Sequence, residues 1–136
     1  MVLVDTSVWI DFFRNKDHAA VRQFIGICNN HIPFGITGVI YQEILQGAAS
    51  ATDFKRLSDS LQTQLFFHPK DNLATYHEAA KIYFDCRRRG ITVRSTIDCL
   101  IAQIAIEQRL CLLHHDRDFE VIKQVRPQLN FVGPTN

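Results

Sequence analysis

The sequence predicts an α/β protein, with a three-layer α/β/α sandwich around a central and mostly parallel sheet. Short apolar runs at 2–4 and 110–113 have the unbroken hydrophobicity of parallel strands that are buried on both faces. Between such runs, apolar residues recur at spacings of three and four, as they do along one face of a helix. Strands that alternate with helices favour a parallel sheet with helices on both sides.

The remaining elements follow the same alternation. Further strand candidates are 32–36, 65–68 and 130–133, and a helix is expected over 39–47. Gly90 ends another helix, and residues 47–51 are expected to form a helix end and a turn. Three helical faces are expected from apolar spacing: Val21, Phe24, Ile25 and Cys28; Phe54, Leu57 and Leu61; and Leu73, Tyr76, Ala80 and Tyr83.

Length and composition indicate one domain that spans residues 1–136. With 46% hydrophobic residues, a chain of this length can bury roughly two thirds of its unfolded surface. No repeat or linker interrupts it. The net charge of +1 gives no global electrostatic argument for nucleic acid, so any basic patch must be local.

The cysteines and the N-terminal segment indicate a cytoplasmic location. The four cysteines are widely spaced, form no C-x-x-C pair and lie among apolar neighbours, so we expect reduced and buried thiols. Residues 1–13 are apolar but lack a basic leader and contain Asp5 and Asp11. They are therefore expected to be neither a signal peptide nor a membrane span, and we expect a soluble protein with no membrane partner.

Four acidic residues stand at the edges of apolar segments, where carboxylates are out of place. Asp5 and Asp116 each follow a predicted buried strand, and ligands of open α/β sheets bind beyond the carboxyl ends of strands. Glu43 lies in line with apolar residues of its helix, and Asp98 shares a helical face with Ile101. Converging carboxylates at such positions would form a site for a hard metal ion.

Each acid also has a structural explanation, and the sequence leaves these alternatives open. Asp5 can cap the helix that follows it, and Glu43 can pair with an arginine. Ser95 and Asp98 fit the capping-box pattern. A polar turn into a helix can explain both Asp116 and Asp118. Asp118 can also be a contact of metal-bound water or the N-cap of the last helix.

One metal centre explains all four acids together. Unpaired carboxylates about 4 Å apart repel by about 4 kcal/mol per pair at an effective dielectric constant near 20, so they need a cation or a bound proton. Oxygen ligands select Mg²⁺ or Mn²⁺ over zinc or copper. The adjacent His114 and His115 lack the spacing of a zinc pair, and no cysteine is close enough in sequence to complete one.

Four blocks in this order and spacing resemble the PIN-domain ribonucleases, and most closely the VapC toxins of toxin–antitoxin pairs. The resemblance implies a PIN-like fold, an acidic quartet of Asp5, Glu43, Asp98 and Asp116 that binds Mg²⁺ or Mn²⁺, and cleavage of RNA. It also implies an antitoxin partner and a homodimer. The blocks are 4–10 (VDTSVWI), 41–47 (YQEILQG), 94–102 (RSTIDCLIA) and 116–119 (DRDF).

The resemblance also implies roles for neighbouring residues. Thr6 or Ser7 matches a hydroxyl beside the first acid, and Asp118 matches an accessory acid. Where the family often has Thr or Asn before the fourth acid, this chain has His115, so the hydrogen bonds of Asp116 are left undetermined. The early helices of such proteins accept the antitoxin, so Trp9, Phe12 and Phe13 are candidates to line that groove.

Cations near the acids are candidates for RNA phosphate contact. Arg94 precedes the Asp98 helix, and Arg117 lies between two acids of the last turn. The run 87–89 (RRR) is expected chiefly to end a helix and to face solvent.

Three other functions remain as rivals. A haloacid-dehalogenase phosphotransferase needs a second Asp where this chain has Ser7, and a receiver domain needs an acidic pair and a late lysine that are not evident. The third rival is a PIN-like scaffold that binds RNA or a partner without cutting. It predicts that function persists in Asp5→Asn.

Overall fold

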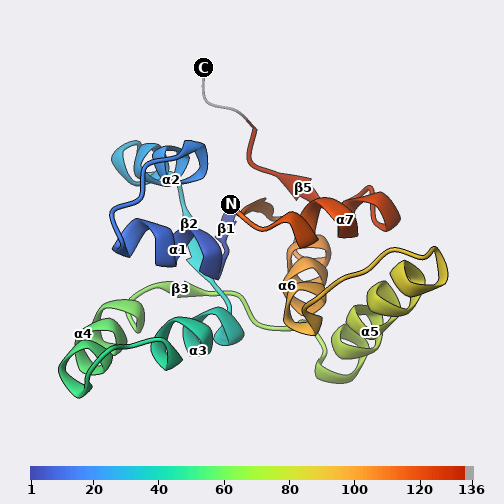
Figure 1. Ribbon diagram of the computed structural model, residues 1–136, viewed down its shortest axis with the longest axis horizontal. Coiled ribbons are helices and arrows are strands. Elements are labelled where there is room, and N and C mark those ends of the chain that lie inside the picture. The colour runs from blue at the N-terminus through green and yellow to red at the C-terminus, as the bar shows by residue number, and fades with distance from the viewer. Residues whose placement is uncertain (134–136) are drawn as a thin grey trace.

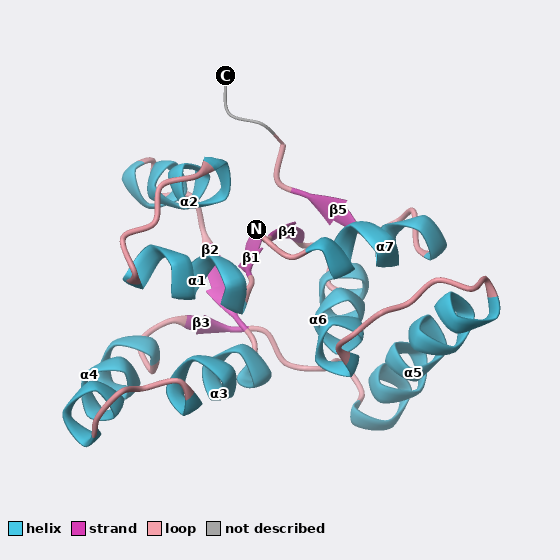
Figure 2. Ribbon diagram, in the orientation of Figure 1, coloured by secondary structure: helices cyan, strands magenta, loops and turns pink. Residues whose placement is uncertain are grey.

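The protein is built around a sheet of five parallel strands, in the order β3-β2-β1-β4-β5 (Figure 2). This computed structural model describes residues 1–133. The parallel sheet confirms the predicted fold class, and each strand lies within its expected range. The strands are β1 (Val2–Val4), β2 (Phe34–Ile36), β3 (Leu65–Phe66), β4 (Cys111–Leu113) and β5 (Asn130–Phe131).

Seven helices in the described residues cover the sheet. In Figure 1, α1 to α4 gather on one side of the strands and α5 to α7 on the other. The helices of each group contact one another, and the strand order with the usual right-handed crossovers sets the two groups on opposite faces of the sheet, which makes three layers. The helices are α1 (Thr6–Phe13), α2 (Ala19–Asn29), α3 (Gly38–Gln46), α4 (Ala51–Leu61), α5 (Asn72–Arg88), α6 (Thr96–Glu107) and α7 (Arg117–Val125).

The central strands fix where the acids lie. β1 pairs with β4 in a register that sets Val4 opposite Leu113, and the backbone N–H of Asp5 donates to Leu113 O at 2.9 Å. The chain segments that follow the two strands therefore leave the same edge of the sheet side by side. Asp5 and the turn before Asp116 are therefore neighbours.

Two of the predicted helical faces are partly wrong. In α2, Val21 and Phe24 are buried as expected, but Ile27 completes the face and Ile25 is 42% exposed. In α4, Leu61 is fully buried, whereas Phe54 is 48% exposed. At 3.6 residues per turn, a spacing of three or four fits two adjacent faces, and packing against the sheet selects one of them.

The prediction for α5 is wrong in a more informative way. Leu73 is 82% exposed and Tyr76 is 53% exposed. The buried face instead consists of Thr75, Ala79, Ile82 and Cys86. Thr75 can be buried because its hydroxyl donates to the carboxylate of Glu107 at 2.9 Å. The apolar face that the sequence indicates exists, but it points outward.

The cysteines are free, as predicted, but only two of them are buried. Cys86 and Cys99 are buried, whereas Cys28 and Cys111 are exposed. Cys28 follows Ile27, which takes the inward position, and Cys111 opens β4 ahead of its buried leucines. Apolar neighbours in sequence therefore did not identify the exposed pair. Within residues 1–133, no helix has the length and hydropathy needed to cross a membrane.

Candidate metal centre

Asp5 lies where β1 ends and is held by Ser7. Its side chain is almost completely buried, with an exposed fraction of 3%, and it is the N-cap of α1. Oδ2 of Asp5 accepts hydrogen bonds from Ser7 N at 3.0 Å and from Ser7 Oγ at 2.6 Å. Ser7 Oγ in turn accepts from the N–H of His115 at 3.0 Å. Asp5 therefore caps α1, as the sequence allowed, and also lies in the acidic cluster.

Glu43 is held by the other hydroxyl of the pair. Thr37 caps α3 directly after β2, which places Glu43 in the second turn of that helix. Thr6 Oγ1 donates to Glu43 Oε1 at 2.7 Å. The arginine partner considered for Glu43 is not found, since no ion pair to it forms within residues 1–133. Thr6 and Ser7 thus divide their roles, one for each carboxylate.

Asp98 is the acid whose carboxylate is least satisfied. Ser95 Oγ caps α6 by accepting from the backbone N–H of Asp98 at 3.4 Å. This bond leaves the side chain of Asp98 free. Its exposed fraction is 6%, and its Oδ2 is buried without a hydrogen-bond partner among the described residues. A buried carboxylate oxygen in this state needs a cation or a proton.

Asp116 and Asp118 begin α7. Asp116 is the N-cap and accepts from the N–H of Asp118 at 2.9 Å, so the alternative that Asp118 is the N-cap is wrong. Asp118 is buried and accepts from the N–H of Arg94 at 2.9 Å, with Arg94 Nε 3.5 Å from its other oxygen. Asp98, Asp116 and Asp118 each offer a carboxylate oxygen, and these atoms lie within 4.8 Å of one another.

The five acids lie close enough for the other four to repel the charge on Asp98. Burial, followed by repulsion from Asp5, Asp116, Asp118 and Glu43, raises the pKa of Asp98 to about 8. Burial also raises the pKa of Asp5 to about 6, although the hydrogen bonds from Ser7 oppose that rise. A donor set made only of carboxylate oxygens, one of which has no hydrogen-bond partner in residues 1–133, fits a hard divalent cation.

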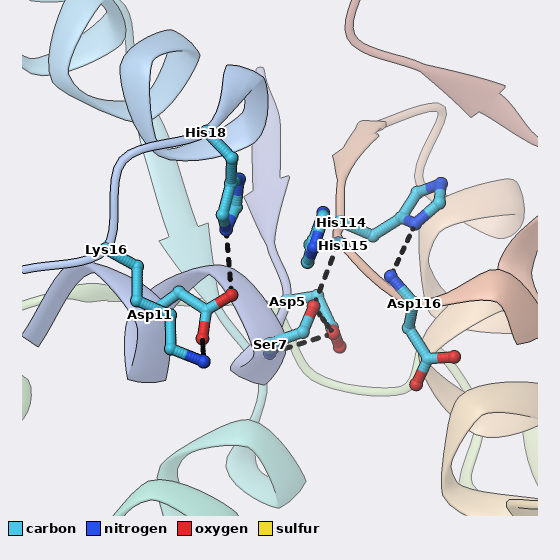
Figure 3. A network of polar contacts seen from close by, with 8 residues as sticks. All are labelled: Asp5, Ser7, Asp11, Lys16, His18, His114, His115 and Asp116. Atoms are coloured by element: carbon cyan, nitrogen blue, oxygen red, sulfur yellow. Dashed lines mark hydrogen bonds and ion pairs between the residues drawn. The ribbon is translucent and has the colours of Figure 1, made fainter. Parts of the chain in front are cut away.

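The two histidines beside the centre have different roles. His114 Nδ1 accepts from the N–H of Asp116 at 3.1 Å, and burial lowers the pKa of this imidazole, which favours the neutral acceptor. This bond supplies the local anchor of Asp116 that the sequence left undetermined. The ring of His115 instead stacks on His18, with centroids 3.8 Å apart, and His18 Nε2 meets Asp11 Oδ2 at 2.8 Å (Figure 3).

Sequence reasoning did not assign any role to Asp11 or His18. Both lie far from His115 in the chain, and no spacing or periodicity links them. The order of the strands brings them together, because the end of α1 and the start of α2 lie beside the turn that follows β4.

Arg94 and Arg117 border the acids on their outer side. Together with Thr92, Asp118 and Val121 they line a small polar hollow of about 180 Å³. The side chain of Arg94 is 72% exposed even though it contacts Asp118. Both guanidinium groups are therefore accessible to an anion.

Comparison with known proteins identifies the class. The sequence model of the PIN-domain family matches residues 2–125, so the chain belongs to this family. Within that family it is similar to ribonuclease VapC11 of Mycobacterium tuberculosis, with 34% identity over 129 residues that cover 92% of this chain and 93% of the relative. The resemblance seen in the sequence is thereby confirmed.

Solved structures agree with the fold. VapBC-1 from nontypeable Haemophilus influenzae superposes with a TM-score of 0.71 at 15% identity, covering 97% of each chain. A toxin–antitoxin complex from Klebsiella pneumoniae gives a TM-score of 0.68 at 18% identity, covering 100% of this chain and 99% of the other. At these identities the likeness concerns the fold.

Proposed function

We propose that this chain is a metal-dependent endoribonuclease, the toxin of a toxin–antitoxin pair, which hydrolyses RNA phosphodiester bonds at the acidic cluster. The observation that carries the proposal is the convergence of the carboxylates of Asp98, Asp116 and Asp118, together with the buried Oδ2 of Asp98, which has no partner in residues 1–133. The similarity to a VapC ribonuclease over nearly the whole chain supports the same function. The proposed ligands of Mg²⁺ or Mn²⁺ are Asp5, Glu43, Asp98 and Asp116.

The chain's own residues prepare the site. The hydroxyls of Ser7 and Thr6 orient Asp5 and Glu43, and the hydrogen bond from Ser7 favours the ionised form of Asp5. Asp118 joins the start of α7 to the chain at Arg94, so its accessory role is to position the segments that carry Asp98 and Asp116. When bound, a divalent ion lowers the pKa of a water molecule and offsets charge on the phosphate oxygens.

RNA contact is proposed for Arg94 and Arg117. Both guanidinium groups flank the polar hollow beside Asp118, at a position where a phosphate next to the acids can reach them. Arg87, Arg88 and Arg89 are assigned no RNA contact. They end α5, and the first two lie over the ring of Phe84.

The antitoxin is proposed to bind a groove of about 480 Å³ between α1, α3 and α4. Of the three aromatic candidates only Phe13 lines it, because Trp9 and Phe12 pack against Phe24 in the core. An apolar floor with a charged rim suits an amphipathic segment. The floor consists of Ile10, Phe13, Ile44 and Leu57, and the rim of Arg14, Asp53 and Arg56.

A homodimer is proposed through the outward apolar face of α5. Tyr76, Ala80 and Tyr83 line a cleft of about 440 Å³ with Ile97 and Leu100 of α6. Exposed aromatic residues beside such a cleft are typical of protein interfaces. Sedimentation of the purified chain tests this, and the substitution Tyr76→Glu is expected to shift it towards monomer.

The function is tested by RNA cleavage in Mn²⁺ or Mg²⁺ with wild type, Asp5→Asn and the exposed control Asp59→Asn. We expect cleavage by wild type and the control but not by Asp5→Asn, with folding of all three confirmed by circular dichroism. Induction in bacteria should arrest growth only for the two active forms. Mapping RNA ends after brief induction then names the target. If Asp5→Asn cuts RNA as well as wild type, the proposal is wrong.

A further inference from the structure

We propose that Asp11, His18 and His115 form a second metal site, separate from the acidic cluster, that takes a transition-metal ion such as Zn²⁺. The three residues come from α1, from the residue that precedes α2, and from the turn between β4 and α7. Each offers one ligand atom, and these atoms lie within 4.8 Å of one another. The site goes beyond the ribonuclease function and does not depend on it.

The environment of the site suits a bound ion. The side chain of Asp11 is 14% exposed and that of His18 is 23% exposed, while His115 lies on the open side. Nδ1 of His18 is buried without a hydrogen-bond partner in the described residues. The nitrogen of this ring that lies beside Asp11 is Nε2, at 2.8 Å from Asp11 Oδ2, so Nε2 is the atom that the ring offers to an ion.

The donor set distinguishes this site from the acidic cluster. Two imidazole nitrogens and one carboxylate oxygen suit Zn²⁺ and neighbouring transition ions, whereas the cluster around Asp98 offers only oxygen, which suits Mg²⁺ and Mn²⁺. Three protein ligands also leave a fourth position open to water, as in zinc sites that are not fully enclosed by protein. The two sites can therefore be loaded and measured separately.

Ion binding requires local rearrangements, one of which replaces the 2.8 Å contact between His18 Nε2 and Asp11 Oδ2. The rings of His18 and His115 are inclined by only 16°, and two nearly parallel rings cannot both direct a lone pair at one ion. The exposed ring of His115 must turn, while its backbone stays fixed by the N–H bond to Ser7 Oγ. Lys16 Nζ, 3.6 Å from Asp11 Oδ1, is an exposed cation that the incoming ion displaces.

An ion at this site joins segments that also support the acidic cluster. His115 N–H donates to Ser7 Oγ, and Ser7 Oγ donates to Asp5. Zn²⁺ would thus connect α1 and the start of α2 to the turn between β4 and α7 (Figure 3). His115 in this turn is the residue that donates to Ser7. The expected consequence is stabilisation of the folded state.

The test is a calorimetric titration of the whole chain with Zn²⁺ in excess Mg²⁺, which occupies the acidic cluster. Wild type should bind one Zn²⁺, and His18→Ala and His115→Ser should each weaken that binding at least tenfold. Asp98→Asn, in the other site, and His77→Gln, an exposed histidine elsewhere, should bind Zn²⁺ as wild type does. Co²⁺ in place of Zn²⁺ should give visible absorption bands that are lost with either histidine.

Three outcomes would overturn the second site. These are no binding of Zn²⁺ by wild type, equal binding by both histidine variants, or loss of binding in Asp98→Asn. Circular dichroism and a retained rise in melting temperature with Mn²⁺ show that a variant is folded. His115→Ser changes only an exposed side chain and keeps the backbone bond to Ser7, so it tests the site even if His18→Ala fails to fold. No RNA is involved, so failure here leaves the ribonuclease proposal standing.

Discussion

The two sides of the acidic cluster hold their carboxylates in different ways. Asp5 is slightly more buried than Asp98, with exposed fractions of 3% and 6%, yet its pKa rises only to about 6 while that of Asp98 rises to about 8. Ser7 donates two hydrogen bonds to Asp5, whereas Asp98 Oδ2 receives none. Burial raises the pKa of both acids; hydrogen bonds from Ser7 oppose the rise at Asp5, whereas repulsion from four carboxylates adds to it at Asp98.

The carboxylates on the two sides of the cluster are therefore stabilised in different ways. The hydrogen bonds from Ser7 stabilise the ionised form of Asp5, and Thr6 donates a hydrogen bond to Glu43. On the other side, Asp98 meets the repulsion of four neighbouring carboxylates with no donor to its Oδ2. The side around Asp98 is thus where a divalent ion contributes most.

The largest expected effect comes from Asp98→Asn. RNA cleavage should fall by more than the roughly 100-fold that loss of an outer-shell partner causes. Because the pKa of Asp98 is raised in the folded state to about 8, its removal should at the same time stabilise the metal-free protein at pH 8 by several kcal/mol, measured by urea unfolding. The same substitution at exposed Asp59 should change neither quantity. Lower stability of metal-free Asp98→Asn would contradict the comparison.

A smaller loss is expected from Ser7→Ala. Without the hydroxyl, Asp5 loses its shortest hydrogen bond, so its pKa rises further and its orientation loosens. Cleavage should fall about 10- to 100-fold, and the acidic limb of the pH–rate profile should move to higher pH. Ser58→Ala, which removes a hydroxyl remote from the acids, is the control. An unchanged profile would show that Ser7 does not tune Asp5.

The stability of the metal-free protein should depend on pH with a defined sign. The pKa values of Asp5 and Asp98 are raised in the folded state above the ordinary 3.8, so the folded state binds more protons than the unfolded chain. Their contribution is complete below about pH 4 and is lost as pH rises through about 6 and then about 8. Urea unfolding from pH 4 to 8 without divalent ions measures the decline, and saturating Mn²⁺ should lessen it. If the stabilities of wild type and of Asp98→Asn both rise from pH 4 to pH 8, the pKa values of Asp5 and Asp98 are not raised in the folded state.

The smallest effect is expected from Arg94→Gln, on the side of Asp98 and Asp118. The backbone N–H of residue 94 still holds Asp118, so the fold should persist, and only the exposed guanidinium contact with phosphate is lost. RNA affinity should weaken by about 1 kcal/mol, and its dependence on salt concentration should become shallower. Arg56→Gln, on the far helix α4, controls for loss of one charge. Equal effects of the two variants would remove Arg94 from the RNA contacts.

Sequence alone was sufficient where a pattern is local. The apolar runs before Asp5 and Asp116 located β1 and β4, and Ser95 located the start of α6. Sequence alone was insufficient for features that depend on contacts between segments far apart in the chain. The outward face of α5 and the contact of His18 with His115 depend on which segments the sheet order brings together, and no residue spacing contains that information.

The most direct test of the central claim is the melting temperature of metal-free wild type and Asp98→Asn at pH 8 as Mn²⁺ is added. An ion that binds only the folded state should raise the wild-type value progressively through the millimolar range. Asp98→Asn should begin at a higher melting temperature than wild type and should respond little to Mn²⁺. No shift in wild type, or an equal shift in both proteins, would contradict a metal centre built on Asp98.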